Sequence, residues 1–131
     1  MNFDDEYESC ESTYATLCVY STEFDCDNIS ELIGVTPTRT VSKDLNRFSG
    51  QNGWFLSTED SIQSNDLRRH LYHLVKVLSD TGLHSDHLSS CKLWVYCYWS
   101  SSEGNGGPII DVHLMEWMSK LGLDIHFDFY G

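Results

Sequence analysis

The amino-acid sequence predicts an α+β protein, a two-layer sandwich in which helices cover one face of a four-stranded mixed sheet. Three observations favour this class. Four short segments have the alternating or the aromatic and β-branched pattern of strands, and the three segments between them carry apolar residues at helical spacing. The last strand, residues 124–129, is apolar on one side only, so we expect the second face of the sheet to be exposed to solvent.

Size and charge limit the class of protein further. The chain has 131 residues, and we expect a single α+β domain at residues 13–131 after an acidic tail at residues 1–12. The formal net charge is -12, so the chain repels phosphate backbones and nucleic acid is a poor partner. No apolar run reaches the roughly 18 residues that cross a bilayer, and the acidic N-terminus has the wrong sign for a signal peptide. We therefore expect a cytoplasmic protein that binds no membrane.

The first half of the domain is predicted to contain a strand and a short helix. Residues 13–20 form the strand, because apolar and other side chains alternate along them. A helix through Ile29 and Ile33 follows, with Asp27 or Asn28 as its N-cap, and Gly34 suits the left-handed residue that ends a helix.

Residues 35–52 form a long connection with little periodicity. It holds three of the eight basic residues, Arg39, Lys43 and Arg47. Connections of this length in compact domains are often functional. Two interpretations stay open: a solvated loop whose cations offset nearby carboxylates, or a contact with an anion or a partner.

A short strand completes the first half, the longest helix follows it, and the second half is again strand, helix and strand. Residues 53–58 form a short aromatic strand, and a helix with five apolar residues at helical spacing runs from Leu67 towards Gly82, capped by Ser64 or Asn65. Residues 93–99 form a strand, a third helix runs from about Asp111 to Gly122, and residues 124–129 form the last strand.

The two ends of the domain resemble each other. Residues 14–20 are similar to 93–99, and residues 31–35 are similar to 119–123. This indicates two βαβ-like halves joined by the long helix. Short amphipathic segments also resemble one another by chance, and that explanation stays open.

The predicted open face is aromatic and acidic. If Ala15, Leu17 and Val95 face the helices, alternation places on the other side Tyr14, Thr16, Tyr20, Trp94, Tyr96, Tyr98, Asp124, His126 and Asp128. Exposed rings of this kind mark interaction sites, and the face lacks the cations of nucleic-acid platforms. A basic protein is therefore the expected partner, unless the tail or the long loop covers the rings.

Motifs for catalysis or metal binding are not completed. His70 and His73 lie one helical turn apart and His84 and His87 follow, but no His-Glu-x-x-His pattern is present, so we expect helix-surface and loop histidines and no metal. The Gly-Asn-Gly-Gly of residues 104–107 completes no phosphate-binding pattern. Five cysteines without a Cys-x-x-Cys pair favour buried thiols. The sequence thus predicts a protein without enzymatic activity or cofactor.

Two segments carry a family resemblance. Ile-Ser-Glu-Leu-Ile-Gly-Val-Thr-Pro-Thr-Arg at residues 29–39 and Gly-Trp-Phe-Leu-Ser at residues 53–57 resemble bacterial proteins of the domain of unknown function 4279 family. The likeness extends over almost everything after the acidic tail and implies no catalytic residue. Small bacterial proteins similar to this family can accompany secreted toxins as immunity partners, which makes a toxin domain the implied partner.

Two functions follow as expectations. The first is an immunity protein that neutralises a basic bacterial toxin, with a nuclease as one form of that toxin. Its expected contact residues are Tyr96, Tyr98, Asp124, His126 and Asp128, with Glu23, Asp25 and Asp27 as steering charge. The alternative is a sensor or enzyme for a small anion that uses Arg39, Lys43, Arg47 and Trp54.

Overall fold

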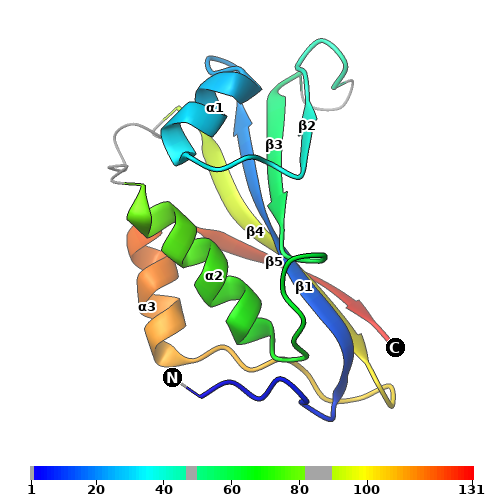
Figure 1. The fold of residues 1–131 in the computed structure, drawn as a ribbon. Helices are drawn as coiled ribbons and strands as arrows, with labels where there is room; N and C mark the ends of the chain where they lie inside the picture. The colour runs from blue at the N-terminus through cyan, green and yellow to red at the C-terminus, as the bar shows by residue number, and fades with distance from the viewer. Residues whose placement is uncertain (1, 47–49, 82–89) are drawn as a thin grey trace.

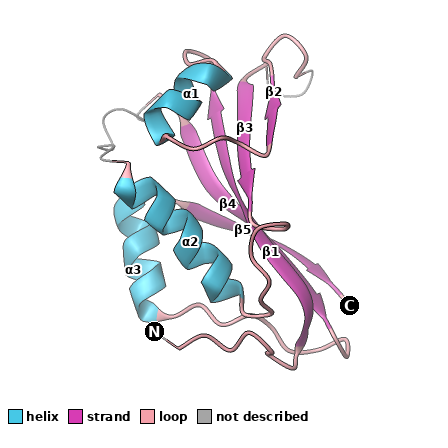
Figure 2. Cartoon of the chain, in the orientation of Figure 1, coloured by secondary structure: helices cyan, strands magenta, loops and turns pink. Residues whose placement is uncertain are grey.

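A computed structural model describes residues 2–46, 50–81 and 90–131 of the chain. The elements in order are β1 (Cys10–Ser21), α1 (Cys26–Ile33), β2 (Arg39–Val41), β3 (Asn52–Ser57), α2 (Leu67–Asp80), β4 (Lys92–Ser101), α3 (Val112–Leu121) and β5 (Asp124–Tyr130). The strands form one open mixed sheet in the order β2-β3-β1-β4-β5, and α2 and α3 lie side by side against it (Figures 1 and 2). The predicted α+β class is confirmed.

The sheet has five described strands rather than the predicted four. The additional strand, β2, lies inside the connection that the sequence left without structure, and it pairs antiparallel with β3 through Arg39 and Phe55 at one end and Val41 and Gly53 at the other. A strand of three residues is too short to show a periodicity. Its hydrogen bonds also depend on a partner strand that lies further along the chain, which no local pattern shows.

The two halves are built differently. β4, α3 and β5 form a βαβ unit, because β4 and β5 are parallel neighbours. In the first half β1 and β3 are antiparallel, so they are not the parallel pair of a βαβ unit. β2 is antiparallel to β3 and hence runs in the direction of β1, with β3 inserted between them. The predicted first βαβ unit, with residues 53–58 as its second strand, is therefore wrong, and the predicted second unit is confirmed.

Carboxylate side chains begin all three helices. Asp25 caps α1 through Asn28 N in a reciprocal capping box, which places Asn28 inside the helix. Asp66 caps α2 rather than the predicted Ser64 or Asn65, and Asp111 caps α3. Gly34 and Gly122 end α1 and α3 at φ 77° and 69°, as predicted, because glycine adopts the left-handed conformation without a steric penalty. Gly82 lies outside the described residues.

The core fills the space between the helices and one face of the sheet. Ala15, Leu17 and Val19 of β1 are fully buried and belong to one cluster with residues of all three helices. Trp54 of β3 is also fully buried, and its indole Nε1–H donates to Ser30 Oγ of α1 at 2.9 Å. All three helices therefore pack against the same face of the sheet, and the opposite face carries no helix in the described part of the chain.

The N-terminal segment contacts the helix layer, which differs from the predicted acidic tail. β1 already begins at Cys10, and Asp4 N donates to Asp66 Oδ2 at 2.8 Å. Asp5 forms an ion pair with Arg69 at 2.6 Å, and the hydroxyl of Tyr7 donates to a carbonyl of the β4–α3 connection at 3.0 Å. These contacts hold the segment beside α2, away from the open face.

Burial corrects the expectation for one histidine. His70 is fully buried rather than on the helix surface, whereas His73 is exposed. His84 and His87 lie outside the described residues. Among the described residues no group of three or more histidines, cysteines or carboxylates has a metal-binding arrangement. No described helix has the length and apolar character to span a bilayer.

Candidate functional site

The sheet face opposite the helices carries the rings and carboxylates that alternation predicted for it. Opposed residues on neighbouring strands share a face, and the register places Tyr14 opposite Tyr98 and Thr16 opposite Tyr96. On β5, His126 lies opposite Tyr96 and Asp128 opposite Tyr98. The predicted placement of these side chains on one face is confirmed.

One row of side chains crosses all five strands of this face. The guanidinium of Arg39 lies 4.2 Å from the ring centre of Phe55. The ring of Tyr20 meets Phe55 edge-on at 5.6 Å and stacks on Trp94 at 4.7 Å. Trp94 in turn stacks on the imidazole of His126 at 5.2 Å. The row is a continuous series of contacts with a cation at the β2 edge.

A second group of rings lies nearer the C-terminal end of β5. Tyr14 stacks on Tyr98 at 5.0 Å, and Tyr98 meets Tyr130 at 5.2 Å. Between the two groups, the hydroxyl of Tyr96 donates to the carboxylate of Asp128. This hydrogen bond and burial raise the pKa of Tyr96 above its ordinary value, so Tyr96 stays a protonated donor at neutral pH.

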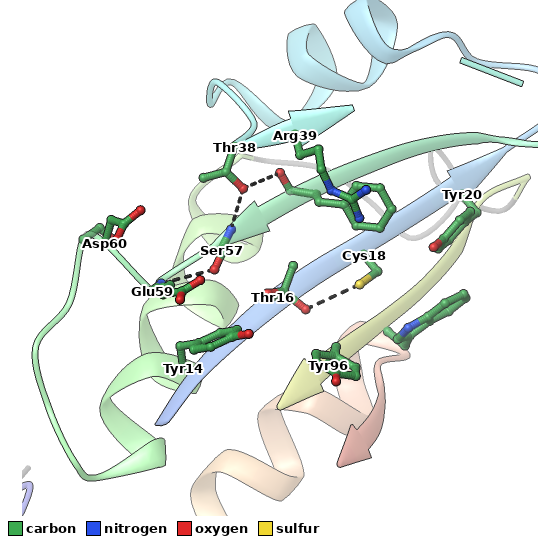
Figure 3. A pocket seen from close by; sticks show the side chains of 13 residues that line it. Tyr14, Thr16, Cys18, Tyr20, Thr38, Arg39, Ser57, Glu59, Asp60 and Tyr96 are labelled. Carbon is green, nitrogen blue, oxygen red and sulfur yellow. Dashed lines mark hydrogen bonds between the residues drawn. The ribbon is translucent and has the colours of Figure 1, made fainter. Parts of the chain in front are cut away.

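The face is hollowed between the rings (Figure 3). The cavity has a volume of about 740 Å³. On the open side of β1, the small residues Thr16 and Cys18 lie between the large rings of Tyr14 and Tyr20, so the middle of the strand forms the floor. The remaining lining residues are Thr38, Arg39, Phe55, Ser57, Glu59, Asp60, Ser61, Trp94 and Tyr96.

The two sides of the hollow have opposite charge. Arg39 is exposed on the β2 side, and no ion pair joins it to a carboxylate in the described chain. Glu59 and Asp60 are exposed on the loop after β3, at the end of the hollow where Tyr14 lies (Figure 3). Thr38 Oγ1 donates to the carbonyl of Phe55 and accepts from Ser57 N, both at 3.0 Å, which ties the connection before β2 to the end of β3.

The thiol of Cys18, on the floor of the hollow, has low reactivity at neutral pH. Burial raises the pKa of Cys18 to about 11, and its Sγ donates to the carbonyl of Thr16 at 3.7 Å. A thiolate, which is the nucleophilic form, is therefore scarce at neutral pH. The hollow is suited to holding a ligand or a side chain by stacking and charge.

The predicted partner-binding residues fall into two groups. Tyr96, Tyr98, Asp124, His126 and Asp128 lie together on β4 and β5, with Asp124 and His126 exposed. The predicted steering residues Glu23, Asp25 and Asp27 are also exposed, but they lie in the β1–α1 connection and the first turn of α1, a helix on the covered face. The structure does not bring the two groups together.

The predicted anion-binding residues are likewise separated. Arg39 reaches the hollow, and Lys43 is exposed in the connection after β2. Trp54 lies in the core, because it is opposite the buried Val19 in the register, whereas Phe55 is opposite Arg39. Arg47 lies outside the described residues. The aromatic partner of Arg39 is thus Phe55, which alternation within residues 53–58 places on the opposite side from Trp54.

The fold and its hollow define an α+β protein with one aromatic sheet face that no described helix covers. A family model described as a domain of unknown function (DUF4279) matches residues 11–131. The chain therefore belongs to the DUF4279 family, as the motifs at residues 29–39 and 53–57 indicate. No curated protein and no solved structure matches the chain significantly.

Proposed function

We propose that this protein is a non-enzymatic immunity protein that acts in the cytoplasm and binds a basic bacterial toxin on its open sheet face. The observation that carries the proposal is the uncovered face itself, on which stacked rings of β1 and β4 lie beside the exposed carboxylates of Glu59, Asp60 and Asp124. Tyrosine and tryptophan are common anchors of protein interfaces.

Preorganisation of the rings supports this function. Tyr14, Tyr20, Trp94 and Tyr98 are each half-buried and already stacked on a neighbour. A side chain that is fixed before binding loses little conformational entropy on binding. The face therefore offers contact area to a partner at a low entropic cost.

Charge supports a basic partner. The chain has a formal net charge of -12, and among the described basic residues Arg68, Arg69 and Lys120 are already paired with carboxylates. A cationic side chain of the partner would enter the hollow from the side of Glu59 and Asp60, away from Arg39. Charge opposition of this kind increases the association rate.

The test measures binding to the toxin candidate encoded by the neighbouring gene. We compare Asp60→Lys/Asp124→Lys with the control Glu31→Lys/Asp80→Lys, which changes the net charge equally on exposed helix positions. We expect the first variant to associate about tenfold more slowly and the control less than about threefold, because local charge dominates steering. Trp94→Ala is expected to increase the dissociation rate.

Two results would contradict the proposal. One is the absence of both a complex and rescue of growth in cells that produce the toxin candidate. The other is equal slowing by the two charge variants, which would place the partner on another surface.

A second candidate is a binding site for a small organic anion in the hollow. Its volume of about 740 Å³ lies within the roughly 300 to 1,000 Å³ typical of small-molecule sites, and Arg39 supplies a cation beside an aromatic wall. A thermal-shift panel of aromatic carboxylates and phosphates tests this. We expect a hit to raise the Tm of the wild type and of Lys43→Gln, but not of Arg39→Gln. A panel without any Arg39-dependent shift would eliminate this candidate.

A further inference from the structure

β5 forms one edge of the sheet and is long enough to pair further. Its seven residues pair with β4 on one side, and no described strand pairs with the other side (Figure 1). The backbone N–H and C=O groups that point outward from an edge strand are free to bond another strand. The opposite edge, β2, has only three residues.

Apolar side chains gather at the β5 edge. Phe127 and Phe129 are 41% and 56% exposed, and their rings stack at 5.1 Å. On α3, Met115 and Val112 are 51% and 69% exposed. They lie on the flank of α3 away from α2, since Trp117 on the other flank donates to Ser79 of α2 at 2.7 Å. Exposed, stacked rings on a free edge strand are typical of an interface.

We propose that β5 pairs antiparallel with β5 of a second copy of this chain, so that two five-stranded sheets join into one. Such an interface has a two-fold axis and presents the same surface from both copies. The strand then satisfies its own outward backbone groups, and the helix layers of the two copies lie on the same side of the joined sheet.

The side chains of β5 select one register for this pairing. With Phe127 opposite Phe127 of the second copy, Ile125 lies opposite Phe129 on the helix side. On the open side His126 lies opposite Asp128, and Asp124 lies opposite Tyr130. Opposed side chains in an antiparallel pair interact directly, so apolar meets apolar and the imidazole meets a carboxylate.

The neighbouring registers are unfavourable. A shift of two residues places either Asp124 opposite Asp128 or Asp128 opposite itself, and like charges directly opposite are destabilising. A shift of one residue turns the second copy over, which sets apolar side chains against polar ones and separates the two helix layers. The pattern of β5 is thus self-complementary in the Phe127-centred register.

The carboxylate of Asp128 can accept one hydrogen bond within its own copy and another from the second copy. Its Oδ2 accepts the hydroxyl of Tyr96 within the same copy. Its Oδ1 can accept from the imidazole of His126 in the second copy. The contact occurs twice, once on each side of the axis.

Sedimentation velocity of the full chain over a range of concentrations tests the proposal. We expect a concentration-dependent dimer for the wild type and a monomer for Phe127→Lys. The matched control is Leu45→Lys, which replaces a residue that is 77% exposed in the connection between β2 and β3, and we expect it to remain dimeric. Circular dichroism checks that each variant is folded.

A charge exchange tests the register. We expect His126→Glu and Asp128→Lys each to weaken self-association at least about tenfold, because the first places two carboxylates opposite each other and the second replaces the carboxylate that accepts from His126 with a cation. An equimolar mixture of the two variants is expected to form a heterodimer, since the introduced glutamate of one copy would meet the introduced lysine of the other, and the remaining His126 would meet the remaining Asp128. A monomeric wild type, a dimeric Phe127→Lys variant or a mixture no more associated than its components would overturn the proposal.

Discussion

At the scale of single residues, His70 connects three segments of the fold. Its Nε2 lies 2.9 Å from the carbonyl of Ser64, which can only accept, so Nε2 carries the proton. Its Nδ1 therefore accepts from the hydroxyl of Thr58 at 2.6 Å. Thr58 Oγ1 also accepts from Ala15 N of β1 at 3.0 Å. The buried imidazole thus ties α2 and the loop before it to the central strand.

We predict that His70 makes stability depend on pH. Burial lowers the pKa of His70 below its ordinary 6.5, so the unfolded chain binds more protons between the two values. The free energy of unfolding should therefore decrease as pH falls below about 6.5 and level off below the folded pKa. Urea unfolding at a series of pH values measures this.

A pair of variants isolates the imidazole. His70→Ala should lower the free energy of unfolding by about 2 to 4 kcal/mol at neutral pH. It should also remove the decrease of that free energy as pH falls below about 6.5. His73→Ala, an exposed position one turn further along, should change neither. Asp66 contributes at lower pH: burial opposes its ionisation, but hydrogen bonds from Arg68 and Asp4 N outweigh it and hold its pKa below 3.8. If the free energy of unfolding of His70→Ala kept the same pH dependence as the wild type, that dependence would come from other groups.

At the scale of elements, the N-terminal segment stabilises the start of α2. The ring of Phe3 lies 5.5 Å from that of Tyr72, and Asp5 O accepts from Asn65 N at 2.9 Å just before the helix. The hydroxyl of Tyr7 bonds Gly107 O in the connection before α3. The segment therefore joins the starts of two helices that are far apart in sequence.

We predict a measurable loss of stability when this segment is weakened. Tyr7→Ala removes a hydrogen bond and partly buried ring contacts, and should cost about 2 kcal/mol, seen as a lower Tm and faster hydrogen exchange at the start of α2. Glu6→Ala in the same segment removes an exposed side chain and should stay within about 0.5 kcal/mol. Equal effects of the two variants would indicate that the docking contributes little.

At the scale of the whole molecule, net charge opposes folding. Twenty acidic and eight basic residues leave a formal charge of -12 on a compact chain of 15.0 kDa. Self-repulsion of this kind is weaker in the expanded unfolded chain, so it destabilises the folded state. Salt screens the repulsion between exposed charges.

We predict that moderate salt stabilises the fold. Raising sodium chloride from about 0.01 M to about 0.15 M shortens the Debye length from roughly 30 Å to 8 Å and should raise the Tm by a few degrees. The same change should slow association with a basic partner. Thermal unfolding monitored by circular dichroism checks the first effect. A Tm that falls with salt would mean that the ion pairs of Arg68 and Arg69 outweigh the repulsion.

The amino-acid sequence by itself determined the features that depend on near neighbours in the chain. Apolar spacing identified three helices and four strands, Gly34 and Gly122 marked two helix ends, and alternation placed Tyr96, Tyr98 and Asp128 on one face. These features follow from the fixed geometry of helices and strands, so a short window of sequence contains the information.

Tertiary structure alone decided the features that depend on distant partners. The pairing of β2 with β3, the antiparallel direction of β1 and β3, the burial of His70 and the docking of residues 2–9 each join segments whose contact no local pattern encodes. The hollow on the open face is of the same kind, because its walls come from β1, β2, β3, β4 and the loop after β3. Packing free energy summed over the whole chain, rather than local preference, selects these contacts.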